Sequence, residues 1–166
     1  MHFQVANAIT MEYPAEYYDA IHSRDAILHM HDKSTLFKNM YKSLKPGGKL
    51  LITDYCRNDD KTVEDKKFEE YVKNYNYDLI TIAKYKSFLT EAGFSNVDGI
   101  DNSRMFSDIL KEELETLSCK DVEDKIKEII GSKEYQAWYD LWKDKIHRVE
   151  KGEHVWGLFT AEKPLL

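Results

Sequence analysis

The sequence predicts an α/β sheet fold, and three observations support this prediction. Segments with apolar residues at helical spacing alternate along the chain with short apolar runs of strand length. Residues 33–54 pass from a helical pattern through a Pro-Gly-Gly turn into a compact apolar strand, which is the order of an α/β crossover. Polar residues follow two expected strands, at 23–25 and 54–56, and the carboxyl ends of strands are where such sheets bind ligands.

The first elements are expected before residue 55. Phe3–Asn7 alternates weakly and is expected to form a short strand, while Tyr18–Ser23 has a stronger strand pattern. Lys33–Leu44 has apolar residues at helical spacing and is expected to be a helix. The breaker and turn Lys45–Gly48 ends this helix, and Lys49–Asp54 follows as a strand buried on both faces.

Helical patterns dominate the rest of the chain. Thr62–Tyr75 and Thr81–Ala92 are expected to be helices, and Gly93 suits a left-handed cap after the second. Phe94–Ile100 is expected to be a strand that pairs with the last strand in a hairpin-like arrangement. The remaining elements are two highly charged helical stretches and that closing strand: Ser103–Ile130, Lys133–Val149 and His154–Ala161.

Length and composition limit the number of domains and the classes of partner that the chain could have. A chain of 166 residues is long enough for one domain and too short for two ordinary ones. We expect a sheet core at 1–101, a helical substrate-side segment at 102–151 and a closing strand at 152–166. The formal net charge of -6 argues against a nucleic-acid surface. Cys56 and Cys119 lack metal-type spacing, and neither a leader nor a long apolar run is present, so no membrane partner and a reduced, cytoplasmic location are expected.

Asp25 and His29 are the first candidate reactive pair. Their spacing of four residues places both side chains on one face if the segment after Tyr18–Ser23 turns helical. An acid could then hold a cationic group while an imidazole accepts a proton. The alternative is that Asp25 caps a helix and His29 only packs or faces solvent. The run His29-Met30-His31-Asp32 lacks a third metal partner at recognisable spacing, so no metal is predicted.

Three stretches together resemble the phosphoethanolamine N-methyltransferases, which are class I S-adenosylmethionine-dependent methyltransferases. They are SRDAILH at 23–29, LKPGGKLLITDYC at 44–56 and WGLF at 156–159. The resemblance implies an incomplete Rossmann-like sheet that lacks its first two strands and carries inserted C-terminal helices. It implies S-adenosyl-L-methionine as methyl donor and a phosphorylated amine as substrate. The implied reaction is N-methylation of phosphoethanolamine and its methylated intermediates toward phosphocholine.

The same resemblance implies roles for single residues. Asp25 matches the aspartate that contacts the substrate amine, and His29 matches the histidine that the family pairs with a tyrosine of an N-terminal lid. Tyr75 stands where the family has a phosphate-binding arginine, which would weaken phosphate recognition by on the order of 2 kcal/mol. The other implied positions line the cofactor (Asn7, Ala8, Ser23 and Arg24) or bind the phosphate end of the substrate (Tyr55, Tyr71, Tyr77 and Lys145).

The glycine-rich turn that follows the first strand of such domains is not found, since the first glycine is Gly47. Three explanations are open: a fragment or truncated gene model of a complete enzyme, a degenerate non-catalytic relative, or a half-domain completed by a missing N-terminal half or second chain. The chain could therefore be an interaction module, since an exposed strand edge invites pairing with another chain. A further alternative, which Tyr75 motivates, is methyl transfer to a less anionic amine.

Overall fold

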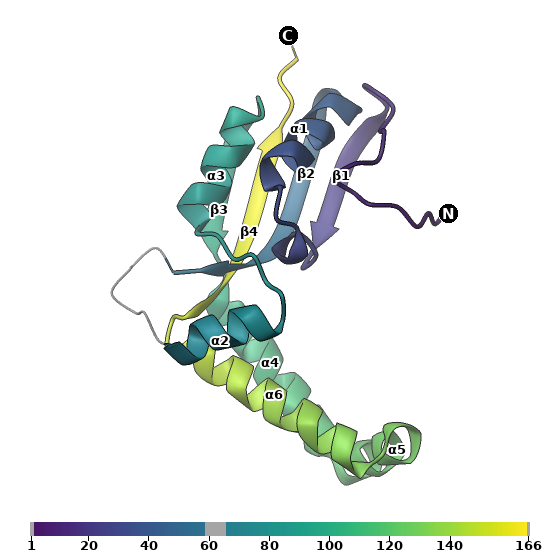
Figure 1. Cartoon of the computed structure of the whole chain (residues 1–166), viewed down its shortest axis with the longest axis vertical. Coiled ribbons are helices and arrows are strands. Elements are labelled where there is room, and N and C mark those ends of the chain that lie inside the picture. Colours follow the sequence, from purple (N-terminus) through teal and green to yellow (C-terminus); the bar gives the residue numbers. More distant parts are fainter. Residues whose placement is uncertain (1, 59–65, 166) are drawn as a thin grey trace. The chain divides into compact units, whose positions relative to one another are not determined.

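The chain folds into two compact units in a computed structural model that describes residues 2–58 and 66–165 (Figure 1). Unit 1 comprises residues 1–101 with 156–166, and unit 2 comprises residues 102–155. The sheet belongs to unit 1, and three helices make up nearly all of unit 2. The prediction of one partial domain in three segments stays a prediction.

The sheet has four strands in the order β1-β2-β4-β3. Strand β1 spans Tyr18–Arg24 and pairs in parallel with β2, Leu44–Arg57. Strand β3 spans Ser95–Asp101 and pairs antiparallel with β4, His154–Glu162. The predicted α/β fold class is confirmed, and the last two strands pair as expected. Strand β1 lies at one end of this order, so one of its edges has no strand neighbour among the described residues.

Three helices and a short 3-10 turn complete unit 1: α1 (Lys33–Ser43), α2 (Lys66–Asn74), α3 (Ile82–Glu91) and η1 (Ile27–His29). The core forms where α1 and α3 meet the sheet. The ring of Tyr85 on α3 stacks on Phe159 of β4 at 4.0 Å between centroids, and Phe37 of α1 lies 5.2 Å from Tyr85. All three rings are completely buried. The apolar spacing of α1 and α3 therefore places both helices over the sheet, as Figure 1 shows.

Side chains and glycine fix the helix ends of unit 1. The Asp32 carboxylate accepts a hydrogen bond from the Thr35 amide at 3.0 Å, and the Thr81 hydroxyl accepts one from the Lys84 amide at 3.1 Å. Gly93 follows α3 with φ +108°, and a Cβ there would lie 3.0 Å from the ring of Tyr41. The expected glycine cap after this helix is confirmed.

The predicted strand at residues 3–7 and the predicted turn at 45–48 both need correction. Residues 3–7 form no strand, and Phe3 and Val5 are fully or almost fully exposed. The described part of the chain offers this segment no neighbouring strand, so its backbone has no ladder to join. The predicted turn Lys45–Gly48 lies inside β2 instead. The Gly47 amide donates to the Lys163 carbonyl at 2.8 Å, and the Lys163 amide donates to the Gly48 carbonyl at 2.9 Å, so the residue that follows β4 pairs with this motif.

Unit 2 consists of α4 (Ser103–Ser118), α5 (Lys120–Ile130) and α6 (Ser132–Glu150). The predicted single stretch Ser103–Ile130 is two helices, because the backbone at Cys119 is extended with ψ 125°. Contacts between α4 and α6 stabilise the unit: Trp142 Nε1 donates to Glu113 at 2.8 Å, and the Tyr135 hydroxyl donates to the Leu117 carbonyl at 2.7 Å.

The other helix predictions agree with the structure. The N-terminal part of the predicted helix Thr62–Tyr75, residues 62–65, lies outside the described residues, and α2 covers the rest of it to Asn74. No helix in the described part of the chain is both long and apolar enough to cross a membrane. The cytoplasmic location stays a prediction.

Candidate functional site

Asp25 lies directly after β1, at the carboxyl edge of the sheet. Its amide donates to the Thr53 carbonyl of β2 at 2.8 Å, which extends the β1–β2 ladder by one residue. Its backbone has φ 47°, a left-handed conformation that aspartate tolerates better than most residues. The indole Nε1 of Trp156 on β4 donates to Asp25 Oδ1 at 2.8 Å. Two neighbouring strands therefore fix the position of this carboxylate.

The helix that would place Asp25 and His29 on one face does not form. The left-handed turn at Asp25 ends the strand, and only Ile27–His29 follow as a 3-10 turn. Both residues still lie within five positions of the end of β1, where ligands bind in open α/β sheets.

His29 belongs to an aromatic cluster built from η1, β2, α2 and the segment after α2. The imidazole lies 5.2 Å from the Tyr77 ring, and the rings of Tyr55 and Tyr71 lie 6.2 and 5.6 Å from Tyr77. Tyr75 stacks against Tyr77 at 5.6 Å. The structure thus brings together His29 and all four tyrosines that the sequence assigned to the substrate. We call these five residues the tyrosine cluster.

Burial keeps the inner tyrosines of this cluster neutral. Desolvation raises the pKa of Tyr71 well above its usual value, and it also raises the pKa of Tyr77. Tyr75 differs because 41 % of it is exposed. The cluster therefore offers neutral rings and hydroxyl groups, with one tyrosine open to solvent.

Asp54 belongs to the polar segment 54–56 that was expected at the ligand-binding edge, but it is buried, and the sequence analysis gave it no individual role. Its side chain is 0 % exposed; Oδ1 accepts from the Leu28 amide at 3.1 Å and Oδ2 accepts from the Tyr85 hydroxyl at 3.2 Å. Burial raises the pKa of Asp54 to about 7, although both hydrogen bonds and the charge of Lys33 act in the opposite direction. Its place after an apolar strand was the signal in the sequence, but its partners are 26 and 31 residues away.

Lys33 is a buried cation to which the sequence analysis gave no role. Only 2 % of it is exposed, and its ammonium group donates to the carbonyls of Met30 and Asp78, both at 2.7 Å. It also forms an ion pair with the Asp78 carboxylate at 2.9 Å. A charge that is buried needs such partners. Lys33 therefore ties the start of α1 to the segment that carries Tyr77.

The four residues assigned to the cofactor lie in different surroundings. Ala8 and Ser23 line a cavity of about 360 Å³ beside β1, together with Tyr13, Tyr18 and Ile21. Asn7 is exposed, and its side-chain oxygen accepts from the Ile9 amide at 2.9 Å. Arg24 points to solvent, with 78 % of its side chain exposed. The structure therefore brings Ala8 and Ser23 together and leaves Asn7 and Arg24 outside the cavity lining.

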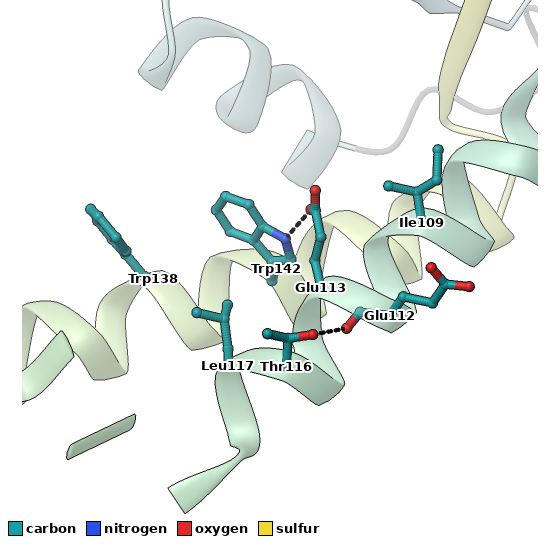
Figure 2. A pocket seen from close by; sticks show the side chains of 7 residues that line it. All are labelled: Ile109, Glu112, Glu113, Thr116, Leu117, Trp138 and Trp142. Atoms are coloured by element: carbon teal, nitrogen blue, oxygen red, sulfur yellow. Dashed lines mark hydrogen bonds between the residues drawn. The ribbon is translucent and has the colours of Figure 1, made fainter. Parts of the chain in front are cut away.

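Lys145, the remaining predicted substrate residue, lies in unit 2. It is 8 % exposed, and its ammonium group lies 4.9 Å from the centre of the Trp142 ring. Trp142 also borders a second pocket, of about 530 Å³, between α4 and α6 (Figure 2). None of the predicted site residues lines that pocket. In the described residues, no three His, Cys, Asp or Glu side chains are grouped so that they could hold a metal ion.

The comparisons with known proteins agree with the resemblance in the sequence. Residues 1–98 match the family model described as methyltransferase domain. Phosphoethanolamine N-methyltransferase 1 of Zea mays is 42 % identical over 161 residues, which is 97 % of this chain and 31 % of the maize protein. The phosphoethanolamine N-methyltransferase of Plasmodium falciparum is 37 % identical over 97 % of this chain and 60 % of its own length.

Solved structures show the same similarity in three dimensions. Phosphoethanolamine N-methyltransferase 2 of Haemonchus contortus, in complex with phosphomonomethylethanolamine and S-adenosylhomocysteine, superposes with a TM-score of 0.88 at 30 % identity, over 95 % of this chain and 36 % of that one. A putative sarcosine dimethylglycine methyltransferase from Galdieria sulphuraria shares the fold, with a TM-score of 0.80 at 18 % identity over 97 % of this chain and 58 % of that one.

The match covers nearly all of this chain but only part of its relatives. The chain spans about a third of the length of the plant relatives that it matches. The family model nevertheless matches more than half of the chain, and the Haemonchus structure has the same fold. The chain therefore belongs to the methyltransferase-domain family, and it is similar over almost its whole length to phosphoethanolamine N-methyltransferases.

Proposed function

We propose that this chain provides the amine-binding and proton-accepting part of a methyltransferase that methylates phosphoethanolamine and its methylated intermediates toward phosphocholine. The observation that carries the proposal is the fixed Asp25 carboxylate at the end of β1, in the same unit as the imidazole and tyrosine rings of the tyrosine cluster. The similarity to phosphoethanolamine N-methyltransferases supports the same substrate class.

The cavity beside β1 suits part of an adenosyl cofactor. Tyr13, Tyr18 and Ile21 give it aromatic and apolar walls, which fit a flat purine ring, and Ser23 adds a hydroxyl group. When bound, S-adenosylmethionine supplies a methyl group on a positively charged sulfur. Ala8 and Ser23 would hold the cofactor from this cavity, and the proposed roles of Asn7 and Arg24 require these exposed side chains to turn toward it.

His29 is the proposed general base. A primary alkylammonium group has a pKa of about 10, so an amine needs to lose a proton before its nitrogen can attack a methyl group. Imidazole is the side chain that accepts protons near neutral pH. Its ring lies beside Tyr77, and its Nδ1 lies 3.4 Å from the Asn76 carbonyl, so its other nitrogen, Nε2, is the one proposed to accept the proton.

Asp25 and the tyrosines are proposed to bind the two ends of the substrate. The Asp25 carboxylate would orient the amine and stabilise the positive charge that increases on nitrogen as the new bond forms. Tyrosine rings attract cations that have no hydrogen to donate, which is the state of a fully methylated nitrogen. The hydroxyl groups of Tyr55, Tyr71, Tyr75 and Tyr77 are proposed to bind the phosphate end. The phosphate-binding role of Lys145, in unit 2, stays a prediction from the family resemblance.

Methyl transfer and cofactor binding can be measured separately. The assay compares the 166-residue chain alone with a fusion that adds the part of the Plasmodium falciparum relative that this chain does not match. We expect S-adenosylmethionine binding and turnover of phosphoethanolamine in the fusion. In it, His29→Ala and Asp25→Ala are each expected to lower kcat by at least about 100-fold. The matched control is His147→Ala, an exposed histidine on α6. Unchanged turnover in both site variants would show that these roles are wrong.

The open edge of β1 favours a second candidate function, a non-catalytic interaction module. A strand from another segment of the protein or from a second chain would add to this edge. Gel filtration and calorimetry of the 166-residue chain distinguish the two candidates. A module is folded and specifically associated without binding S-adenosylmethionine, whereas an enzyme part binds the cofactor once its sheet is complete.

A further inference from the structure

The residues before and after His29 have main-chain groups that form hydrogen bonds with buried ionisable side chains. The Leu28 amide, one residue before His29, donates to Asp54 Oδ1 at 3.1 Å. The Met30 carbonyl, one residue after His29, accepts from the Lys33 ammonium at 2.7 Å. Asp54 is 0 % exposed and Lys33 is 2 % exposed, so water does not compete for either bond.

The same two side chains also connect η1 to the rest of the site. Asp54 Oδ2 accepts from the buried Tyr85 hydroxyl of α3 at 3.2 Å. Lys33 forms its ion pair with Asp78, whose amide in turn donates to the Leu28 carbonyl at 2.7 Å. The peptide units on both sides of Leu28 are thus bonded, one to β2 and the other to the segment that carries Tyr77.

We propose that Asp54 and the Lys33–Asp78 pair are positioning residues that hold His29 in register with Tyr77. None of these three residues is proposed to touch the substrate or the cofactor. Asp54 acts through the Leu28 amide, and the Lys33–Asp78 pair acts through the Met30 carbonyl and the 76–78 segment. The inference rests on the proposed function of His29 for its catalytic consequence, but the positioning itself can be measured without turnover.

Two substitutions of Asp54 separate positioning from simple loss of charge. Asp54→Asn keeps an oxygen that can accept from the Leu28 amide, and Asp54→Leu has a similar size but no acceptor. The raised pKa of Asp54, about 7, supports a neutral amide as a suitable replacement. The matched control is Asp98→Leu, because the exposed Asp98 carboxylate also accepts a main-chain amide, that of Gly99 at 2.8 Å.

The first measurement is nuclear magnetic resonance of the 166-residue chain. In Asp54→Leu we expect the Leu28 amide to exchange with solvent at least about tenfold faster and the His29–Tyr77 ring contact to weaken. Asp54→Asn and Asp98→Leu are expected to keep both signals. Lys33→Met provides an independent variant on the other side of His29 and is expected to weaken the same ring contact. If Asp54→Leu does not fold, the His29–Tyr77 ring contact in Lys33→Met alone tests the proposal. Unchanged signals in the folded variants would overturn the proposal.

The second measurement is kinetics of the active fusion. Asp54→Leu is expected to lower kcat between about 10-fold and 100-fold, because a base displaced by a fraction of an ångström loses its alignment. The KM for S-adenosylmethionine is expected to stay within about twofold, and Asp54→Asn is expected to recover most of the rate. An Asn variant as slow as the Leu variant would contradict positioning. A fusion without turnover contradicts the proposed function, while the magnetic resonance result still decides the positioning.

Discussion

Unit 1 buries a carboxyl group, whereas unit 2 buries an imidazole. Asp54 in unit 1 and His154 in unit 2 are both 0 % exposed. Burial raises the pKa of Asp54 from 3.8 to about 7. Burial, together with the positive charges of Lys145 and Arg148, lowers the pKa of His154 from 6.5 to about 3. The same physical cause, loss of hydration of the charged form, keeps both groups neutral in mildly acidic solution.

Asp54 and His154 should therefore make the stability of their units depend on pH in opposite directions. Between pH 3.8 and 7, folded Asp54 holds a proton that the unfolded chain has released, so its contribution to the free energy of unfolding falls as pH rises. Between pH 3 and 6.5, unfolded His154 binds a proton that the folded chain lacks, so its contribution falls as pH falls. Through these two groups alone, acid should remove stability from unit 2 and add it to unit 1.

Asp54→Asn should have the largest effect on this comparison. Between pH 4 and 7, the free energy of unfolding of the unchanged chain should fall relative to that of the variant by on the order of 4 kcal/mol, which is about 1.4 kcal/mol for each pH unit. Chemical denaturation at several pH values, followed by amide signals of β1 and β2, measures it. The control is Asp98→Asn, an exposed aspartate of the same unit. Parallel pH curves for the chain and the Asp54 variant would show that Asp54 is charged in the folded state.

His154→Gln should reverse the pH response of unit 2. From pH 6.5 to 4, the unchanged chain should lose on the order of 3 kcal/mol of unfolding free energy relative to the variant, because only the histidine gains a proton on unfolding. Amide signals of α4 and α6 report this unit. His147→Gln, at an exposed histidine of α6, is the matched control. If the free energy of unfolding of unit 2 still falls as pH falls in the His154 variant, groups other than His154 cause that fall.

Tyr75→Arg tests the substrate preference of the tyrosine cluster. A guanidinium group pairs with phosphate through charge-assisted hydrogen bonds, which a neutral hydroxyl cannot match. In the active fusion we expect the KM for phosphoethanolamine to fall about tenfold while that for ethanolamine stays the same. Tyr75→Phe is the matched variant without the hydroxyl. Equal turnover of phosphoethanolamine and ethanolamine by the unchanged protein would favour the less anionic amine as substrate.

Trp142→Phe should have the smallest effect and should be confined to unit 2. It removes the indole donor that bonds Glu113 at 2.8 Å on the surface between α4 and α6 (Figure 2). We expect the unfolding free energy of unit 2 to fall by about 1 kcal/mol and that of unit 1 to stay the same. Amide exchange in the two units provides the measurement. An equal loss in both would show that they unfold as one.

Much of the fold follows from local patterns. The apolar spacing of residues 33–44 and 81–92 predicted α1 and α3 to within a residue or two, and Gly93 marked the end of α3, because these helices satisfy their own backbone. The strand predicted at residues 3–7 failed because a strand needs a neighbour, and alternation in the sequence does not supply one. The turn predicted at 45–48 became part of β2 because Lys163, more than a hundred residues later, pairs with it.

The sequence by itself determined the family and the α/β class, because short motifs and local apolar spacing do not depend on distant neighbours. The family resemblance named the residues that the structure groups in the tyrosine cluster, and their roles stay a prediction. Only the tertiary structure decided how Asp25 is fixed, since its partner Trp156 lies 131 residues away. It also decided that Asp54 and Lys33 are buried on the two sides of His29. Burial and long-range hydrogen bonds are properties of packed neighbours, and packing shifts the pKa values that make these groups testable.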